Sequence, residues 1–459
     1  MSLDNLPVEW MNVKISDITV KGEQRKPNDS EEFIYVDIGS INRDLKKIEN
    51  PQFLLGKDAP SRARKVIKKG DVLVSLTRPN LNAVALVGEN YDQQIASTGF
   101  EVISPMIVES KYLFSLVRTQ HFINEISKQE QGALYPAAKS SDVQAYDFPL
   151  PPLAEQQEIV RQLDVMLAQV EQIKTRLDAI PAILKKFRQS VLADAVSGKL
   201  TEDWRSQNNI EDWKWETWFD ITTKSKDAFK RGPFGSSLKK SMFVEQGFKV
   251  YEQYCPINDD CSYARYYITP EKFEEMKEFE VKDGDFLISC SGVSLGRITQ
   301  VPLNSERGII NQALLRVRLD NSKYDSDFFK ILFRSPTFQK VIFENSTGSA
   351  IPNLKAAKLL KQIPVPMPNL MEQENIVTRV YELYRSISLI EESVQSAQKR
   401  VNLLTQSILA KAFSGELTAE WREQHQELIT GVNSAESLLA KIQAEREASK
   451  PVKKAKKVK

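Results

Sequence analysis

The sequence predicts two globular α+β domains separated by two long antiparallel coiled-coil helices, arranged as an internal pseudo-two-fold repeat. Three observations lead to this fold class. Residues 155–205 recur without a gap as residues 372–422. Both copies contain a heptad pattern of apolar residues. A weaker recurrence links the segments that precede them, where Gly70–Ser75 matches Gly284–Ser289.

Apolar residues follow one another at alternating spacings of four and three in both copies, which is typical of a coiled-coil seam. In the first copy they are Ile159, Leu163, Met166, Val170, Ile173, Leu177, Ile180, Leu184, Phe187 and Val191. In the second copy they are Ile376, Val380, Leu383, Ile387, Ile390, Val394, Ala397, Val401, Leu404 and Ile408. Because each globular segment precedes its helix, antiparallel packing of the seams would place the two domains at opposite ends of a spacer about 60 Å long.

The ends of the long helices carry capping signals. Asn369, three residues before Glu372, predicts a capping box at the start of the second helix. Gly198 and Gly415 stand where left-handed C-caps are expected. Pro181 lies inside the first helix, where a proline removes a backbone donor, so a kink is predicted there.

The globular segments show mixed strand and helix signals. Apolar, β-branched runs predict strands at residues 71–76, 83–87, 285–289, 298–301 and 314–319. Helical periodicity covers residues 111–126, 325–343 and 434–448. The proline-rich residues 149–152 and 364–368 cannot continue a helix or a central strand, so they are predicted to be extended links. Each segment is therefore predicted to be a compact α+β domain with a curved sheet.

These features divide the chain into five parts. The first globular domain covers residues 1–150 and the first spacer helix residues 151–205. The second globular domain covers residues 206–368 and the second spacer helix residues 369–425. Residues 426–459 are predicted to form a C-terminal helix and a lysine-rich tail.

Composition excludes some classes of protein. The 459 residues include 63 lysines and arginines against 61 aspartates and glutamates, so the net charge of +2 does not by itself indicate a nucleic-acid binder. No apolar run is long enough to cross a membrane, and the N-terminus lacks the features of a signal peptide. The three cysteines lack metal-ligand spacing and are predicted to be reduced thiols. Together these features predict a cytoplasmic protein without a membrane partner.

Motifs for catalysis are missing from the sequence. It has two histidines, His121 and His425, and neither a phosphate-binding glycine loop nor a cysteine cluster. No spacing of carboxylates singles out a metal pair. The chain is therefore predicted to be non-catalytic, without a cofactor or metal of its own. An enzyme is one alternative, and a two-headed protein–protein adaptor with a coiled-coil spacer is another.

Sequence motifs flank both long helices. The first helix is entered by Pro149–Gln156 (PLPPLAEQ) and left by Ser190–Trp204 (SVLADAVSGKLTEDW). The second copy ends in Ser407–Trp421 (SILAKAFSGELTAEW). Together with the final helix, Ser434–Glu447, these residues resemble the specificity subunit of type I restriction–modification enzymes. The resemblance is specific because the motif occurs twice in one chain.

The resemblance implies two target-recognition domains, each of which reads one half of a bipartite site in double-stranded DNA. The helices would set the gap between the half-sites and dock two modification (methyltransferase) subunits, and restriction (motor-nuclease) subunits would then join. S-adenosylmethionine, ATP and Mg²⁺ would belong to those partner subunits and not to this chain.

In the first target-recognition domain, Arg78, Asn80 and Asn82 lie on a loop directly after a predicted strand. Arginine can pair with guanine and asparagine with adenine in the major groove, so these residues are candidate DNA contacts. A polar hairpin loop without DNA contact is the alternative. The basic run at residues 62–69 suits phosphates or a solvated face. Lys139 closes a second loop, which could contact DNA or simply lead into a helix.

The second target-recognition domain contains a glycine-bearing stretch with flanking cations, Lys230–Lys240. Glycines allow close approach of the backbone, and hydroxyl groups can hold phosphates. The candidate contacts within it are Arg231, Ser236, Ser237, Lys239 and Lys240. Arg297 and Lys355 close two further candidate loops. We predict that Lys239 and Lys240 contact phosphates, whereas Arg78 contacts a base.

Overall fold

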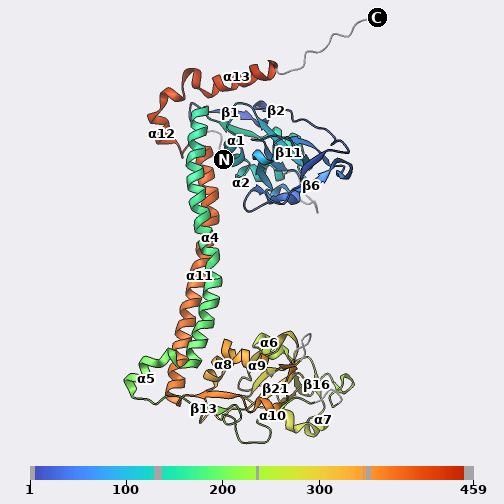
Figure 1. The fold of residues 1–459 in the computed structure, drawn as a ribbon, viewed down its shortest axis with the longest axis vertical. Helices are drawn as coiled ribbons and strands as arrows, with labels where there is room; N and C mark the ends of the chain where they lie inside the picture. Colours follow the sequence, from blue (N-terminus) through green and yellow to red (C-terminus); the bar gives the residue numbers. More distant parts are fainter. Residues whose placement is uncertain (1–5, 129–136, 234–236, 345, 348–352, 449–459) are drawn as a thin grey trace. The chain divides into compact units, whose positions relative to one another are not determined.

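The computed structural model describes residues 6–128, 137–233, 237–344, 346–347 and 353–448. The chain forms two compact units. Unit 1 consists of residues 1–177 and 396–459, and unit 2 of residues 178–395. Each unit contains one globular domain and a part of both long helices, α4 (Leu153–Ser197) and α11 (Leu370–Ser414) (Figure 1).

The globular domain of unit 1 is built on two four-stranded sheets. Its strands are β1 (Met11–Lys14), β2 (Thr19–Val20), β3 (Glu32–Val36), β4 (Ile41–Asn42), β5 (Lys47–Ile48), β6 (Gln52–Leu55), β7 (Ala63–Ile67), β8 (Val72–Ser75), β9 (Val84–Leu86), β10 (Gln94–Ser97), β11 (Phe100–Pro105) and β12 (Asp147–Leu150). One sheet has the order β2-β11-β8-β9 and the other β6-β3-β10-β7. Strands β3 and β10 pair in parallel, whereas β10 pairs with β7 antiparallel.

The globular domain of unit 2 repeats this architecture. Its strands are β13 (Lys214–Thr217), β14 (Phe229–Arg231), β15 (Phe248–Tyr251), β16 (Tyr267–Ile268), β17 (Glu280–Val281), β18 (Phe286–Ser289), β19 (Ile298–Gln300), β20 (Gly308–Ile310), β21 (Leu314–Val317), β22 (Ser346–Thr347), β23 (Asn353–Leu354) and β24 (Pro364–Met367). The sheet orders are β14-β21-β18-β19 and β16-β15-β20-β17, and β15 pairs with β20 in parallel, as β3 does with β10. The structure thus confirms the internal repeat and the predicted strands.

Each unit also contains short helices. Those of unit 1 are α1 (Ser110–Leu116), α2 (Gln120–Ser127), α3 (Ser140–Gln144), α12 (Ala419–Gln424) and α13 (Ala435–Ala448). Those of unit 2 are α5 (Glu202–Asn208), α6 (Tyr254–Asn258), α7 (Pro270–Glu275), α8 (Ser326–Arg334), α9 (Pro336–Glu344) and α10 (Ala357–Leu360). No helix among these and the two long ones, within the described ranges, is long and apolar enough to span a membrane.

Two helices predicted as single are each divided. The predicted helix at 111–126 breaks between α1 and α2, where the Thr119 hydroxyl caps a new helix by accepting from the Phe122 backbone N–H at 3.2 Å. The predicted helix at 325–343 breaks at Ser335, because Pro336 disfavours helical backbone in the residue before it. The proline-rich links are extended as predicted, but they also form strands: β12 pairs with β1, and β24 pairs with β13.

The long helices pack antiparallel within each unit, as predicted. In unit 1, Ile159 and Leu163 near the start of α4 share a buried core with Leu409 and Phe413 near the end of α11. In unit 2 the ends are exchanged: the last turns of α4 pack with the first turns of α11 through Val191, Ala195, Ile376 and Val380. The N-terminal end of one helix therefore meets the C-terminal end of the other in both units.

The predicted helix ends are largely confirmed. Gly198 and Gly415 adopt left-handed φ values of 83° and 80°. The Asn369 side chain accepts from the Glu372 backbone N–H at 2.9 Å, which forms half of the predicted capping box. The Glu372 carboxylate has another role, described below. Helix α4 continues through Pro181 without interruption.

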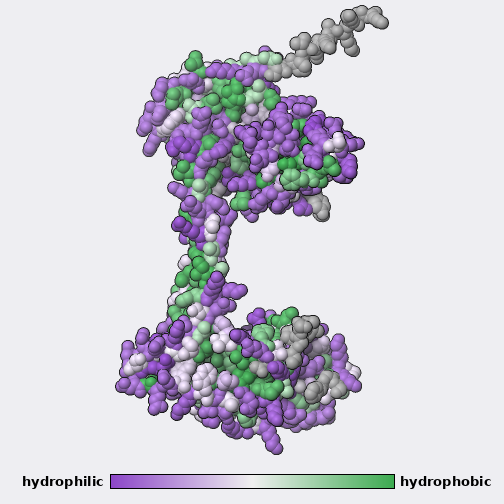
Figure 2. Space-filling model, in the orientation of Figure 1, coloured by the Kyte–Doolittle hydropathy of each residue, from purple (hydrophilic) through white to green (hydrophobic). Residues whose placement is uncertain are grey.

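Some predicted seam residues are exposed, because two helices alone cannot enclose all of an apolar face. They are Met166, Ile173, Phe187, Ile390 and Leu404. Other apolar side chains on the same helices, among them Ile183, Leu389 and Leu403, are exposed as well. Figure 2 shows hydrophobic side chains on the surface of the paired helices.

A buried carboxylate joins the first turn of each long helix to the end of the other repeat. In unit 1, Glu155 accepts hydrogen bonds from Trp10 Nε1 at 2.7 Å, Thr418 Oγ1 at 2.7 Å and Arg422 Nη1 at 2.6 Å. In unit 2, Glu372 accepts from Thr201 Oγ1 at 2.6 Å and Arg205 Nη1 at 2.8 Å. We call these the Glu155 lock and the Glu372 lock. Each one fixes the junction between a globular domain and the helix pair.

Candidate nucleic-acid interface

The loop after β8 and the loop after β18 share one backbone frame. Arg78 and Asn82 have left-handed φ values of 50° and 48° in the first loop, and Gly292 and Gly296 have values of 73° and 77° in the second. The N–H three residues beyond the first left-handed residue donates to the carbonyl of that residue, at 2.9 Å in unit 1 and 3.1 Å in unit 2. The two domains therefore present different side chains on a loop of the same shape.

A left-handed conformation is costly for residues with a Cβ, and glycine adopts it freely. Unit 2 uses glycine at both positions, whereas unit 1 keeps Arg78 and Asn82 there. Strain of this kind persists only where the surroundings over-determine it, and it often marks a functional site.

Each loop lies beside a second candidate segment. In unit 1, Thr77 forms an antiparallel bridge with Ala137, and the Ala138 N–H donates to the Leu76 carbonyl at 2.7 Å. Lys139 follows directly, so the structure places its segment next to the loop of Arg78 and Asn80.

In unit 2, three segments that the sequence analysis singled out meet. Ser291 forms an antiparallel bridge with Asn353, and this bridge corresponds to the one between Thr77 and Ala137 in unit 1. Arg231, half-buried, donates from Nη1 to the Leu354 carbonyl at 2.8 Å and from Nη2 to Asn353 Oδ1. Arg231 thus fixes the segment before Lys355, and its contact with DNA stays a prediction.

Most of the predicted contact residues are accessible to solvent. The exposed ones are Arg78, Asn80, Lys139, Ser237, Lys239, Lys240 and Arg297. Lys355 is half-buried and donates from Nζ to the Glu344 carbonyl at 3.2 Å. Ser236 lies outside the described residues, as do residues 132–136 and 348–352 of the two predicted loops.

Asn82 requires a correction. The residue is only 7% exposed, and its Nδ2 donates to the Val117 carbonyl at 2.8 Å. The Asn82 carbonyl accepts from Lys46 Nζ at 2.6 Å. The sequence suggested a base contact because asparagine is polar and stands on a loop. In the structure its amide ties that loop to the end of α1, so the candidate readers on the loop are Arg78 and Asn80.

Lys46, which the sequence did not single out, anchors the same loop in a partly buried position. Burial is the main cause that lowers the pKa of the Lys46 amine to about 8, and the nearby Arg118 cation is the second. No motif marks this lysine, because it is distant from the loop in sequence.

The sequence analysis also did not identify Gln253 as a residue of this site. Its Nε2 donates to Ser289 Oγ at 2.8 Å and to the Ser291 carbonyl at 2.9 Å, so it holds the base of the unit 2 loop.

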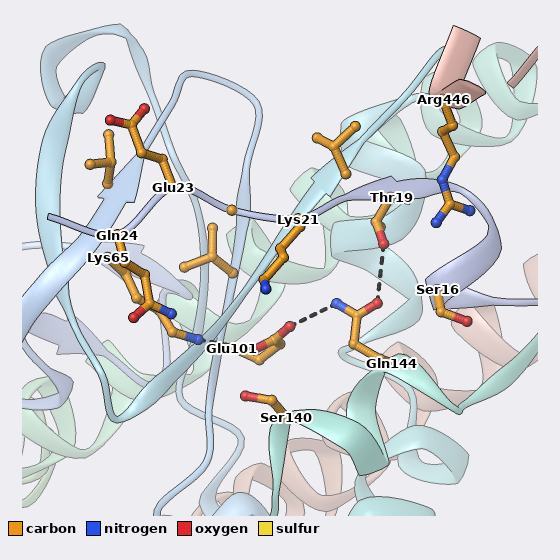
Figure 3. Close-up of a pocket in the computed structure, with 14 residues that line it drawn as sticks. Ser16, Thr19, Lys21, Glu23, Gln24, Lys65, Glu101, Ser140, Gln144 and Arg446 are labelled. Carbon is orange, nitrogen blue, oxygen red and sulfur yellow. Dashed lines mark hydrogen bonds and ion pairs between the residues drawn. The ribbon is translucent and has the colours of Figure 1, made fainter. Parts of the chain in front are cut away.

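A cavity of about 350 Å³ that is lined by several polar and charged residues adjoins helix α3, directly after Lys139 (Figure 3). Glu101 accepts from Lys65 Nζ at 3.0 Å and from Gln144 Nε2 at 2.7 Å, and Gln144 Oε1 accepts from Thr19 at 3.1 Å. Lys65 comes from the predicted basic run, and the structure pairs it with a buried carboxylate. The network joins both sheets of unit 1 to α3, and so it positions the segment that carries Lys139.

Comparison with known proteins is consistent with this arrangement. The family model for the type I restriction modification DNA specificity domain matches residues 7–182 and 234–398. The EcoKI specificity subunit of Escherichia coli K12 is 30% identical over 98% of both chains, and the StySPI specificity subunit of Salmonella potsdam is 30% identical over 98% of both chains. A crystal structure of the HsdS subunit from Thermoanaerobacter tengcongensis aligns with a TM-score of 0.61 at 27% identity, covering 90% of this chain and 98% of that one. Since the family model matches most of the chain, in two copies, the protein belongs to the type I restriction–modification DNA specificity family.

Proposed function

We propose that this chain is the non-catalytic DNA-recognition subunit of a type I restriction–modification complex. Each globular domain reads one half of a bipartite site in double-stranded DNA. The observation that carries the proposal is the shared loop frame, which presents Arg78 and Asn80 in unit 1 and Gly292–Arg297 in unit 2. One frame with two sets of side chains suits two half-sites of different sequence, because side chains that meet base edges determine specificity.

The paired helices are proposed to dock two modification subunits. Unit 1 exposes Ile173 and Leu404 on them, and unit 2 exposes their counterparts in the repeat, Ile390 and Phe187. Exposed apolar side chains gathered on one element favour association with another protein. Equivalent surfaces in the two units provide for two copies of one partner.

The catalytic steps are proposed to take place on those partners. S-adenosylmethionine would bind the modification subunits, and ATP and Mg²⁺ would serve the restriction subunits that join them. Membership of the DNA specificity family supports DNA as the partner of the two domains, over the protein partner that an adaptor would need.

The proposal can be tested by mapping methylated adenines. The chain is co-expressed with its modification subunits in a host that lacks adenine methylation, and cells with the modification subunits alone are the control. The expected result is methylation at one two-part motif with a fixed gap. The double variant Lys239→Ala and Lys240→Ala should methylate the same motif at a lower rate, because phosphate contacts contribute affinity without sequence information. Methylation that does not depend on the chain, or a motif in one uninterrupted block, would refute the proposal.

A further inference from the structure

Val293 is an apolar side chain held entirely in solvent. It lies in the middle of the unit 2 loop, between Gly292 and Ser294, and its exposed fraction is 107%. Leu295, two residues later, is 4% exposed and belongs to the core. A single exposed valine is ordinary on a protein surface. Its exposure therefore indicates a function only if the loop is held in the conformation that exposes it.

The loop is fixed in the conformation that exposes Val293. Gln253 holds its base through Ser289 and the Ser291 carbonyl. The Ser289 and Ser294 hydroxyl groups lie 3.0 Å apart, and the Gly296 N–H donates to the Ser289 carbonyl at 3.1 Å. These hydrogen bonds hold the tip in this conformation. Valine also has few side-chain rotamers to lose, so a contact made by Val293 costs little conformational entropy.

Val293 lines the same cavity as the exposed apolar side chains of Ile257 and Phe343. Polar and charged groups also lie close to this tip. The neighbouring segment carries Asn353 and Lys355, and Arg297 closes the loop itself. Such groups match phosphates and the polar edges of bases. In the major groove, the apolar group that distinguishes one base from the others is the C5-methyl of thymine.

We propose that Val293 packs against the C5-methyl group of a thymine in the half-site read by unit 2, and that it is a specificity-determining residue. The inference rests on the proposed function above, since it requires this loop to enter the DNA. It adds an apolar contact to an interface for which the sequence analysis considered only polar and charged residues.

The test is a double-mutant cycle on the complex of the full chain with its modification subunits. The mapped site is compared with duplexes in which each thymine of that half-site is replaced in turn by deoxyuridine, which removes only the C5-methyl group. One of these replacements should weaken wild-type binding about fourfold, the amount expected for one buried methyl group. Val293→Ala should weaken binding to the unmodified site by a similar factor. The two losses should not add, because both remove the same contact.

Leu303→Ala is the matched control. Leu303 is 80% exposed and follows β19, whereas the Val293 loop precedes it, so the two side chains lie at opposite ends of the β18–β19 hairpin. This variant should bind every duplex as the wild type does. Losses that add at every thymine, no loss in Val293→Ala, or a half-site with no thymine on either strand would each overturn the inference. Failure of the wild-type complex to prefer its mapped site over a scrambled duplex would instead refute the proposed function.

Discussion

Glu155 and Glu372 stand at corresponding positions of the repeat, and both carboxylates are fully buried. The two locks differ in one respect. Trp10 donates to Glu155, whereas Trp213 Nε1 and Glu372 Oε2 in unit 2 are buried with no hydrogen-bond partner among the described residues. A buried polar atom without a partner costs stability, so the Glu155 lock is expected to be the stronger of the two.

Removing the cation of the Glu155 lock should destabilise unit 1. Arg422→Ala leaves the Glu155 charge buried without its counter-ion, so the free energy of unfolding should fall by about 3 kcal/mol. Hydrogen exchange of unit 1 peptides in increasing urea would measure this. Adding Glu155→Gln to the same chain neutralises the unpaired charge and should restore part of the loss. A double variant less stable than Arg422→Ala would contradict this explanation.

Lys46 should make the stability of unit 1 depend on pH. Its pKa in the folded chain is about 8, below the ordinary lysine value near 10.5. Between these two values the unfolded chain binds a proton that the folded chain does not, so stability should rise as pH increases through this window. The measurement is the urea midpoint of wild type and Lys46→Met from pH 7 to pH 10.5. The urea midpoint of the wild type should rise relative to that of the variant above about pH 8. A difference between the two midpoints that does not change with pH would show that Lys46 titrates normally.

Arg78 and Asn82 should behave differently although they lie on the same loop. Arg78→Ala should relax the preference at one base pair of one half-site, at a cost of about 1–3 kcal/mol. Asn82→Ala should instead lower the stability of unit 1, because it removes the hydrogen bond to the Val117 carbonyl. Binding to a panel of single-base variants, together with thermal unfolding, separates these effects. An even loss across the whole panel for Arg78→Ala would place this arginine on a phosphate.

At the scale of elements, the long helices were predictable because their signals are regular and repeated. The heptad spacing, the terminal glycines and the antiparallel pairing all follow from residues that recur in both copies. The locks were missed, although Glu155, Thr418 and Arg422 each have an identical counterpart in the other copy. Polar identities that persist within an apolar repeat were the signal that could have revealed them.

The recognition loops could be predicted less well. Their sequences, RPNLN and GVSLG, share only a leucine, yet their backbone frames agree. The frame is set by left-handed residues and by bridges to segments far along the chain, which local patterns do not report. For the same reason the burial of Asn82 and the contribution of Lys46 were invisible in the sequence.

Lengthening the helix pair should widen the gap between half-sites. Four residues inserted after Leu177, with four more after Gln395, lengthen both helices by about 6 Å. Four residues act roughly as a stutter in the heptad phase, so pairing should survive. At about 3.4 Å per base pair the gap should grow by one or two pairs. Adenine methylation mapping reports the new motif, and an assembled complex that keeps the original gap would refute the role of the helices as a spacer.

At the scale of the whole molecule, the net charge of +2 gives little long-range attraction to DNA. The chain alone should therefore bind its site weakly, and the complex with modification subunits should bind it tightly. Titration of a labelled duplex with each preparation, at two salt concentrations, measures this difference. Tight and specific binding by the isolated chain would contradict it.

The two units also differ in whether their residues are continuous in the sequence. Unit 2 is one continuous stretch, whereas unit 1 is assembled from both ends of the sequence. On the ribosome, residues 178–395 are complete before Leu409, Phe413 and Thr418 have been synthesised. Until then the start of α4 lacks the residues that cover it. Multidomain proteins generally fold from the N-terminus as they are made, but here the second domain can finish first. In the first domain, the core that faces the helix pair is completed only by the last part of the chain. We expect this core to be the part most accessible to chaperones and proteases until then.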